Sequence, residues 1–198
     1  FYRNIKTVFA IHNMKFQGGW KIKEVKDITG LADSIFSAQG LESYGESNYL
    51  KGGIVYSDYI TTVSPTYAKD IATPEGGEGL DGLMYSKKDC LFGILNGLDY
   101  NEFDPQKDEY LYSNFSFDNM VEGKKANKTA LQREMGLPGR PEPMLIGMVS
   151  RMTDQKGFDL VEYMLDEILS TLDVQMVVLG SGEERYENMF RHFASKYP

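Results

Sequence analysis

Two cations, Arg151 and Lys156, stand close together in the segment SRMTDQKG at residues 150–157. The segment follows an apolar run and precedes an amphipathic one that begins near Phe158. In an open parallel sheet, ligands bind beyond the carboxyl ends of strands, next to helix N-termini. Arg offers a planar fork to phosphate oxygens, Lys offers a mobile point charge, and Gly157 would let the backbone approach closely. The pattern predicts an anion site of two cations and free backbone N–H groups; a solvated loop with two surface cations fits it too.

His12 follows the strand-like run at residues 6–11, so it would also project from a carboxyl end. A neutral imidazole there can hydrogen-bond a sugar hydroxyl or a reacting oxygen, although a partly buried histidine satisfied by backbone groups fits the position equally well. The other histidine, His192, lies in a charged helical run and is interpreted as structural or solvated. Two distant histidines and no Asp-x-Asp sequence give no metal site of the usual ligand density.

Turns that contain glycine follow several other apolar runs of the sequence. Asn96-Gly97 is a strong turn signal, residues 73–82 form a flexible acidic loop, and Gly180 and Gly182 flank a turn that could touch a nucleotide. Each is more often plain turn chemistry than a binding site. No pair of carboxylates has a spacing that commits it to acid–base work.

The elements that must position these residues alternate in type. Continuous apolar runs favour strands covered on both faces, as in parallel sheets. Helical patterns separate them. The predicted strands are 6–11, 59–63, 91–95, 144–149 and 174–179, and the predicted helices are 49–56, 65–71, 119–135, 158–169 and 183–196. This alternation predicts α/β layers, with a connection at residues 101–116 that lacks periodicity.

Composition restricts the classes of protein. The 198 residues are 41% hydrophobic, enough for one sizeable domain or two modest ones. A formal net charge of -8, from 29 acidic and 21 basic residues, is a poor match for nucleic acid. The single cysteine, Cys90, excludes an internal disulfide and is expected to be a buried, inert thiol. No run approaches the length of a membrane span.

Several motifs occur together and in order along nearly the whole chain. They are HN at 12–13 with FQG at 16–18, NYLKGG at 48–53, TVSPTYA at 62–68, EGLDGL at 78–83, ILNGLD at 94–99, and SR at 150–151 with QKG at 155–157. The set resembles the ADP-glucose-dependent glycogen and starch synthases of bacterial type. It is far more specific than any one motif, and it favours the anion-binding interpretation of the 150–157 loop.

The resemblance implies a GT-B type α/β fold, with parts of two Rossmann-like domains, that transfers glucose with retention and without a metal. Arg151 and Lys156 match the pair that grips the donor's diphosphate. His12 matches a histidine that contacts the transferred glucose, and Asn96 matches an asparagine near the donor sugar. His12, Arg151 and Lys156 are thus the predicted catalytic residues, and the predicted substrate-binding residues are Asn96, Gln155, Gly157 and Gly180.

The resemblance also implies boundaries. Residues 1–103 would be the C-terminal part of the N-terminal, acceptor-side domain, 104–118 the interdomain connection, and 119–198 the N-terminal part of the nucleotide-sugar-binding domain. The family's Lys-Thr-Gly-Gly loop and its C-terminal loop with an essential Glu are absent from the chain. The sequence is therefore expected to be an internal segment that is inactive alone.

The expected ligands are ADP-glucose and an α-1,4-glucan, without nucleic acid, membrane, cofactor or metal ion. The cytoplasm is the expected location, or a plastid for a plant or algal source. Two alternatives stay open. One keeps the fold but uses UDP-glucose or a small sugar acceptor, and the other is a non-catalytic glucan-binding or regulatory remnant.

Overall fold

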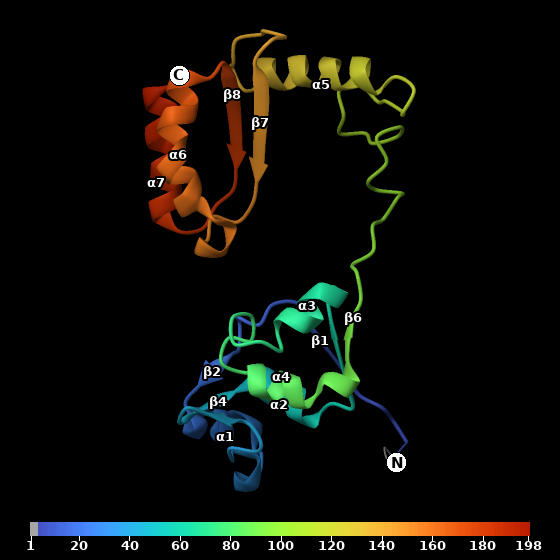
Figure 1. The fold of residues 1–198 in the computed structure, drawn as a ribbon, viewed down its shortest axis with the longest axis vertical. Helices are drawn as coiled ribbons and strands as arrows, with labels where there is room; N and C mark the ends of the chain where they lie inside the picture. Colours follow the sequence, from blue (N-terminus) through green and yellow to red (C-terminus); the bar gives the residue numbers. More distant parts are fainter. Residues whose placement is uncertain (1–3) are drawn as a thin grey trace. The chain divides into compact units, whose positions relative to one another are not determined.

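A computed structural model describes residues 4–198, and the chain divides into two compact units, Phe1–Leu98 and Asp99–Pro198. The predicted boundaries lie a few residues further along the chain, and the roles assigned to the parts stay predictions. The α/β class with parallel strands is confirmed in both units. Figure 1 shows the course of the chain.

The first unit is built on a parallel sheet with the order β1-β5-β6. Its strands are β1 (Val8–Ile11), β5 (Tyr59–Thr62) and β6 (Leu91–Gly93). The helices are α1 (Ile22–Thr29), α2 (Tyr49–Tyr56), α3 (Pro65–Asp70) and α4 (Asp81–Ser86), with short 3-10 turns η1 (Asp33–Ile35) and η2 (Lys88–Cys90). The core joins sheet and helices through Ile11, Met14, Leu50, Ile54, Ile60, Ile71, Leu80 and Met84. The 73–82 segment is anchored there by Leu80, so it is more than a flexible loop.

A small antiparallel sheet, which the sequence patterns did not predict, lies between β1 and α2 in the chain. It has the order β2-β4-β3, from β2 (Gly19–Trp20), β3 (Glu42–Ser43) and β4 (Glu46–Asn48). Strands of two or three residues are too short to show the alternation that marks a strand in sequence. This sheet holds the hairpin turn at Tyr44 and Gly45.

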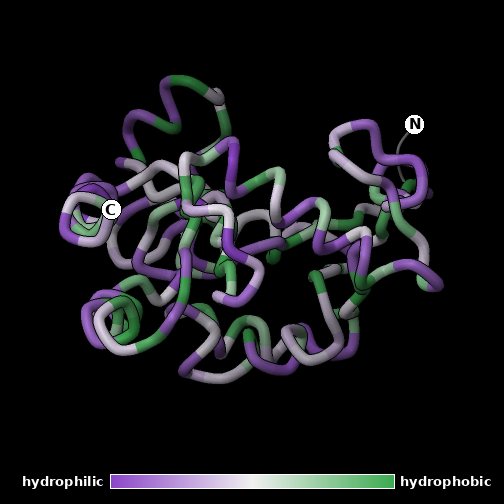
Figure 2. The backbone as a smooth tube through the Cα atoms, turned by 90° about the horizontal axis from the view of Figure 1, so that it is seen from above, coloured by the Kyte–Doolittle hydropathy of each residue, from purple (hydrophilic) through white to green (hydrophobic). Residues whose placement is uncertain are grey.

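The second unit pairs β7 (Met144–Val149) with β8 (Val174–Leu179) in parallel. Helix α5 (Met120–Glu134) precedes β7, the 3-10 turn η3 (Asp154–Lys156) and α6 (Phe158–Thr171) connect the strands, and α7 (Glu184–Lys196) follows β8. Helices α6 and α7 lie beside each other next to the sheet (Figure 1). Figure 2 shows green and purple residues around the helix at the C-terminus, as expected of an amphipathic helix.

The expectation that all strands are covered on both faces is wrong. The side chains of Val8, Phe92, Met144 and Val149 are 61%, 48%, 67% and 80% exposed. An apolar run records which residues are hydrophobic but not how many layers cover them. Cys90 is likewise only half-buried, and its Sγ lies 3.2 Å from the carbonyl oxygen of Lys87.

Candidate functional site

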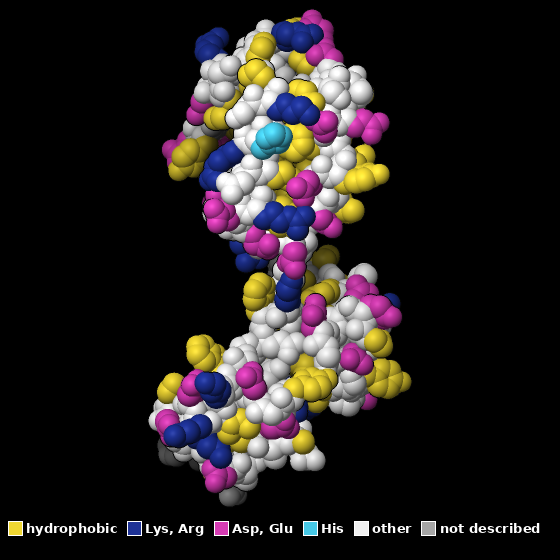
Figure 3. Space-filling model, turned by 90° about the vertical axis from the view of Figure 1, so that its left-hand side faces the viewer, with side chains coloured by type: hydrophobic (Ala, Val, Ile, Leu, Met, Phe, Trp, Pro, Cys, Tyr) yellow, Lys and Arg dark blue, Asp and Glu magenta, His cyan; other side chains and the backbone are white. Residues whose placement is uncertain are grey.

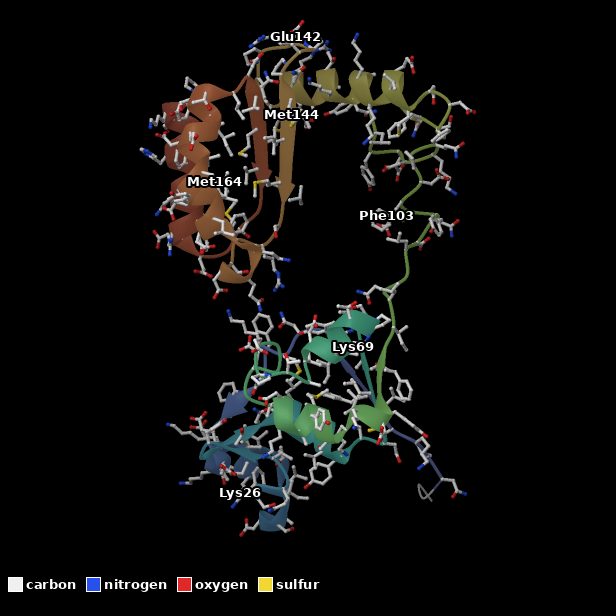
Figure 4. All side chains as sticks on the ribbon, in the orientation of Figure 1. Lys26, Lys69, Phe103, Glu142, Met144 and Met164 are labelled. Atoms are coloured by element: carbon white, nitrogen blue, oxygen red, sulfur yellow. The ribbon has the colours of Figure 1, made fainter. Side chains whose placement is uncertain are left out.

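The 150–157 loop lies at the carboxyl end of β7, as the sequence predicts. Strand β7 ends at Val149, η3 forms one turn, and α6 begins at Phe158. Figure 4 labels Glu142 and Met144 at the start of β7, the end opposite this loop. Gly157 has a φ of 68°, in the left-handed region that favours glycine, and joins η3 to α6. The left-handed conformation therefore explains a glycine at this position, whether or not the residue also contacts a ligand.

Main-chain hydrogen bonds tie this loop to the turn that follows β8. The N–H of Met152 donates to the carbonyl oxygen of Ser181 at 2.9 Å, and the N–H of Glu183 donates to that of Met152 at 2.8 Å. A parallel bridge pairs Met152 with Gly182, so the ladder of β7 and β8 continues past both strands. The Met152 side chain is buried against Phe158. The backbone next to Arg151 is therefore held by bonds rather than left as a free loop.

Two glycines permit this close pairing. A Cβ on Gly180 would lie 2.0 Å from the carbonyl oxygen of Ser150, and one on Gly182 would lie 2.4 Å from that of Met152. Real Cβ atoms do not come so close to backbone oxygens. Gly180 was predicted to bind substrate. The structure gives it a packing role, and contact with a ligand stays a prediction.

The two cations of the loop are exposed to solvent. Within residues 4–198, no ion pair is recorded for Arg151 or Lys156. Gln155 is also exposed and lies between them on η3. Two cations without a carboxylate partner at a strand's carboxyl end can receive an anion without first breaking an ion pair.

The predicted free backbone N–H groups are not found between Met152 and Gly157. Asp154 N donates to Glu183 Oε1 at 3.1 Å, and Gln155 N donates to Asp154 Oδ1 at 2.7 Å. The others donate to carbonyl oxygens, namely Met152 to Ser181, Thr153 to Arg151, Lys156 to Thr153 and Gly157 to Asp154. These donors are bonded within the protein, so the predicted free N–H groups can only be those at the start of α6, where they stay a prediction. None of the N–H groups from Met152 to Gly157 is left for an anion.

Glu183 is a residue that the sequence patterns did not single out. It is the N-cap of α7, and its carboxylate accepts the Asp154 N–H across the two loops. Glu187, one turn on, accepts the Gly182 N–H at 3.0 Å and the guanidinium of Arg191 at 2.6 Å. The Gly182 N–H, followed by Arg191, lowers the pKa of Glu187. An acidic first turn before an amphipathic run is the signal that could have found them.

A hollow in the second unit does not have the two cations in its lining. Its volume is about 680 Å³, and it is lined by Met176, Val178 and Phe190 among others, with neither Arg151 nor Lys156. Its lining does include Met152 and Gly180 of the paired loops. We place the candidate chemistry at the exposed loop, where the charges are.

In the first unit, His12 and Asn96 lie beyond the carboxyl ends of the strands of the parallel sheet. His12 directly follows β1, and Asn96 comes three residues after β6. Because β1, β5 and β6 are parallel, their carboxyl ends meet at the same edge. Strands β1 and β6 flank β5 and so lie about 10 Å apart. Both side chains are exposed, and no contact between them is recorded.

Gln17 joins three of the recognised motifs. Its Oε1 accepts from Asn48 Nδ2 at 2.6 Å, and its Nε2 donates to the carbonyl oxygen of Glu78 at 2.8 Å. The Asn48 side chain also caps α2 by accepting the N–H of Lys51. The segments at 16–18, 48–53 and 78–83 are therefore one hydrogen-bonded region, which spacing in the sequence could not show.

No group of three or more His, Cys, Asp or Glu side chains able to hold a metal ion occurs among residues 4–198. Over the same residues, no helix has the length and apolar character needed to cross a membrane. On the face that Figure 3 shows, acidic and basic side chains are interspersed.

The parallel sheets and a structural match to a starch synthase catalytic domain define a class of protein, the GT-B type of α/β protein. The resemblance to glycogen and starch synthases is confirmed. Residues 1–86 match the family model of the starch synthase catalytic domain. The chain is 54% identical over 197 residues to the glycogen synthase of Lachnospira eligens, and 46% identical over 198 residues to that of Thermotoga maritima.

These alignments cover the whole of this chain but only 41% and 40% of the two relatives, so the chain spans about two fifths of their length. A solved structure, the catalytic domain of Starch Synthase IV from Arabidopsis thaliana bound to ADP and acarbose, matches with a TM-score of 0.86 and 30% identity. The match covers 97% of this chain and 40% of that one.

Proposed function

We propose that this chain is a segment of an enzyme that transfers glucose from ADP-glucose to the non-reducing end of an α-1,4-glucan, with retention of the α configuration. The observation that carries the proposal is the loop that follows β7, where Arg151 and Lys156 have no recorded ion pair. The chain that contains this loop is 54% identical to a glycogen synthase. The ADP in the starch synthase relative supports an adenine nucleotide as the donor's carrier.

The proposed chemistry follows from charge. As the bond between glucose and diphosphate breaks, negative charge grows on the leaving phosphate. Arg151 and Lys156 stabilise that charge in place, because preorganised charges need not reorient during the reaction. No metal ion is proposed. Gln155, Gly157 and Gly180 shape the same donor site in this proposal.

In this proposal His12 and Asn96 act at the sugar rather than at the phosphates. His12 hydrogen-bonds the transferred glucose, and Asn96 lies near the donor sugar. Both come from strand ends of the first unit, the location at which open parallel sheets bind ligands. The cytoplasm stays the predicted location, and inactivity of this chain alone stays a prediction.

The test is glucose transfer from radiolabelled ADP-glucose to glycogen by the whole protein that contains this segment. For Lys156→Ala we expect kcat to fall about 10²–10³-fold, the usual loss of one group that stabilises charge in the transition state. Lys125→Ala, which removes an exposed lysine of α5, is the matched control and should leave kcat unchanged.

Donor competition separates the alternatives. Unlabelled UDP-glucose should compete poorly; strong competition would favour the related enzyme that uses UDP-glucose. If the whole protein binds glycogen but transfers nothing, the non-catalytic glucan-binding alternative replaces the proposal. A Lys156→Ala variant as active as wild type would remove the phosphate role of the loop.

A further inference from the structure

The hairpin between β3 and β4 has an unusual residue at its turn. Its two central residues, Tyr44 and Gly45, have φ values of 52° and 85°. A two-residue hairpin turn with two positive φ angles is of type I′, which strongly favours Asn-Gly. Tyrosine is disfavoured there because its Cβ crowds the backbone in the left-handed region. The turn type explains the positive φ angle at position 44, but it does not explain why the residue there is a tyrosine.

The Tyr44 side chain is not explained by packing in a core either. It is 91% exposed, and its hydroxyl lies 3.7 Å from the position of a Cβ on Gly79. The neighbouring Glu78 has a φ of 49°. Tyr44 and Glu78 are the two non-glycine residues recorded with positive φ in the part of the chain that the structure describes. Such strained residues cluster at functional sites, where the surrounding structure holds the backbone in place.

A hollow of about 380 Å³ lies between the hairpin and the segment that begins α4. Its lining includes Glu42, Ser43, Tyr44, Lys51, Gly79 and Gly82. The wall is therefore one aromatic ring with hydroxyl, carboxylate and ammonium groups beside it, and two glycines that leave room. A site with both charge signs and an aromatic face suits a neutral ligand with hydroxyl groups and apolar C–H faces. A sugar ring has that chemistry.

The walls of the hollow are held by hydrogen bonds. Lys51 Nζ donates to the carbonyl oxygen of Ala38 at 2.7 Å and also to that of Glu42. Gly45 N donates to Glu42 Oε1 at 2.8 Å, which fixes the turn. Gln17 holds the opposite wall through the carbonyl oxygen of Glu78. A preorganised wall lowers the entropy that a ligand must lose on binding.

We infer that the hollow beside Tyr44 binds a glucose unit of an α-1,4-glucan, with the sugar ring against the tyrosine ring. Its residues are distinct from His12 and Asn96, so it holds a part of the polysaccharide other than the reacting end. The identity of the saccharide rests on the proposed function. Holding a branched glucan at a second point raises the effective concentration of its ends at the site of transfer.

Tyr44→Asn tests the site with little risk to the fold, because asparagine is the residue that a type I′ turn prefers. In the whole protein we expect the melting temperature to stay the same or rise. We expect the affinity for glycogen and for maltoheptaose to fall roughly tenfold, as when one ring face is lost from a contact. Affinity electrophoresis in glycogen gels and calorimetry with maltoheptaose measure this directly.

The controls separate the ring from other effects. Tyr44→Phe keeps the ring and should retain most of the affinity. Tyr163→Asn changes a tyrosine of α6 that is 90% exposed and should leave glucan binding unchanged. The KM for ADP-glucose should not change in Tyr44→Asn. A β-1,4-linked glucan of similar length should bind no better to wild type than to Tyr44→Asn.

Two results would overturn the inference. One is a Tyr44→Asn protein with wild-type affinity for glycogen. The other is a Tyr44→Asn protein that loses affinity only together with a lowered melting temperature, which would make Tyr44 structural. Failure of the proposed function looks different: the wild type would bind glycogen through Tyr44 and transfer no glucose.

Discussion

The two units of the molecule hold their candidate residues by different means. In the first, the parallel sheet packs with helices α2 and α4 around a core of eight buried residues, and the amide of Gln17 fastens the surrounding segments. In the second, Met148 of β7 and Val178 of β8 pack against a cluster of three buried residues, Met152, Phe158 and Tyr186, and the loops are fastened through their main chains. Parallel strands alone thus do not determine how a site is positioned.

The second unit also carries surface ion pairs. Arg140 with Asp173, Arg185 with Glu162 and Lys196 with Asp166 all lie on exposed side chains. Exposed pairs contribute about 0–1 kcal/mol each. The small buried cluster and the paired loops are therefore the features whose loss should matter most in this unit.

The largest expected effect is loss of a core side chain. Phe158 is 1% exposed, and its ring centroid lies 5.3 Å from that of Tyr186 and 5.6 Å from that of Phe190. Phe158→Ala should destabilise the second unit by about 3–5 kcal/mol, and Ile54→Ala should destabilise the first by about 2–5 kcal/mol. Hydrogen exchange resolved by peptide measures each unit separately in the whole protein.

Each variant is the control for the other. Phe158→Ala should reduce protection in β7, β8, α6 and α7 and leave β1, β5 and α2 unchanged, and Ile54→Ala should do the reverse. Equal loss of protection in both units by either variant would show one cooperative unit and contradict the comparison.

A smaller effect is expected where a glycine permits close approach. Gly180 faces the carbonyl oxygen of Ser150, and in the first unit a Cβ on Gly93 would lie 2.2 Å from that of Ser64. Gly180→Ala and Gly93→Ala should each cost about 1–3 kcal/mol of stability through overpacking. Only Gly180→Ala should also weaken ADP inhibition of transfer, because it displaces the backbone next to Arg151.

Gly147→Ala is the matched control, since a Cβ at this position in β7 meets no atom within 4 Å. It should leave both stability and ADP inhibition nearly unchanged. If Gly93→Ala weakened ADP inhibition as much as Gly180→Ala, the special role of the paired loops in the second unit would be disproved.

The smallest effect concerns pH. Asp58 accepts the N–H of Thr7 at 2.9 Å and also bonds Lys6, and these bonds lower its pKa to about 2 from 3.8. The stabilisation is present above about pH 4 and is lost as the pH falls through 2, because the native carboxylate must then take up a proton. Asp58→Asn should flatten the acid dependence of hydrogen-exchange protection in the first unit.

Asp166 is the counterpart in the second unit, where hydrogen bonds from Lys196 and then Tyr197 lower its pKa. Asp166→Asn should flatten the acid dependence in the second unit only. An identical change in both units on either substitution would contradict the assignment of each carboxylate to its own unit.

The sequence predicted the longer elements well. Strands β7 and β8 and helix α2 have the predicted bounds, since long apolar or periodic runs give clear signals. Helix α1 was missed although Ile22, Val25 and Ile28 recur at helical spacing in its eight residues, a signal that a longer helix would have repeated. The β3–β4 hairpin was missed because its turn carries Tyr44 in place of the asparagine that marks such turns.

The candidate loop was predicted in the correct place, but the bonding of its main chain was not predicted. Residue types located Arg151 and Lys156 between a strand and a helix, and the structure confirms that location. Free N–H groups were expected beside the two cations, and those of Met152 to Gly157 are all bonded within the protein. Part of that bonding comes from Glu183, which lies 29 residues away from Asp154 in the chain.

By itself, the sequence determined the α/β class, the main strands and helices, the resemblance to glycogen and starch synthases, and the cations of the 150–157 loop. These depend on local periodicity, residue chemistry and ordered motifs, all of which can be read along the chain. The tertiary structure alone decided that Met152 and Glu183 fasten that loop, that Gln17 unites three motifs, and that Tyr44 borders a hollow with Gly79. Hydrogen bonds and close approaches between distant segments depend on how the chain folds back on itself, which no local pattern records.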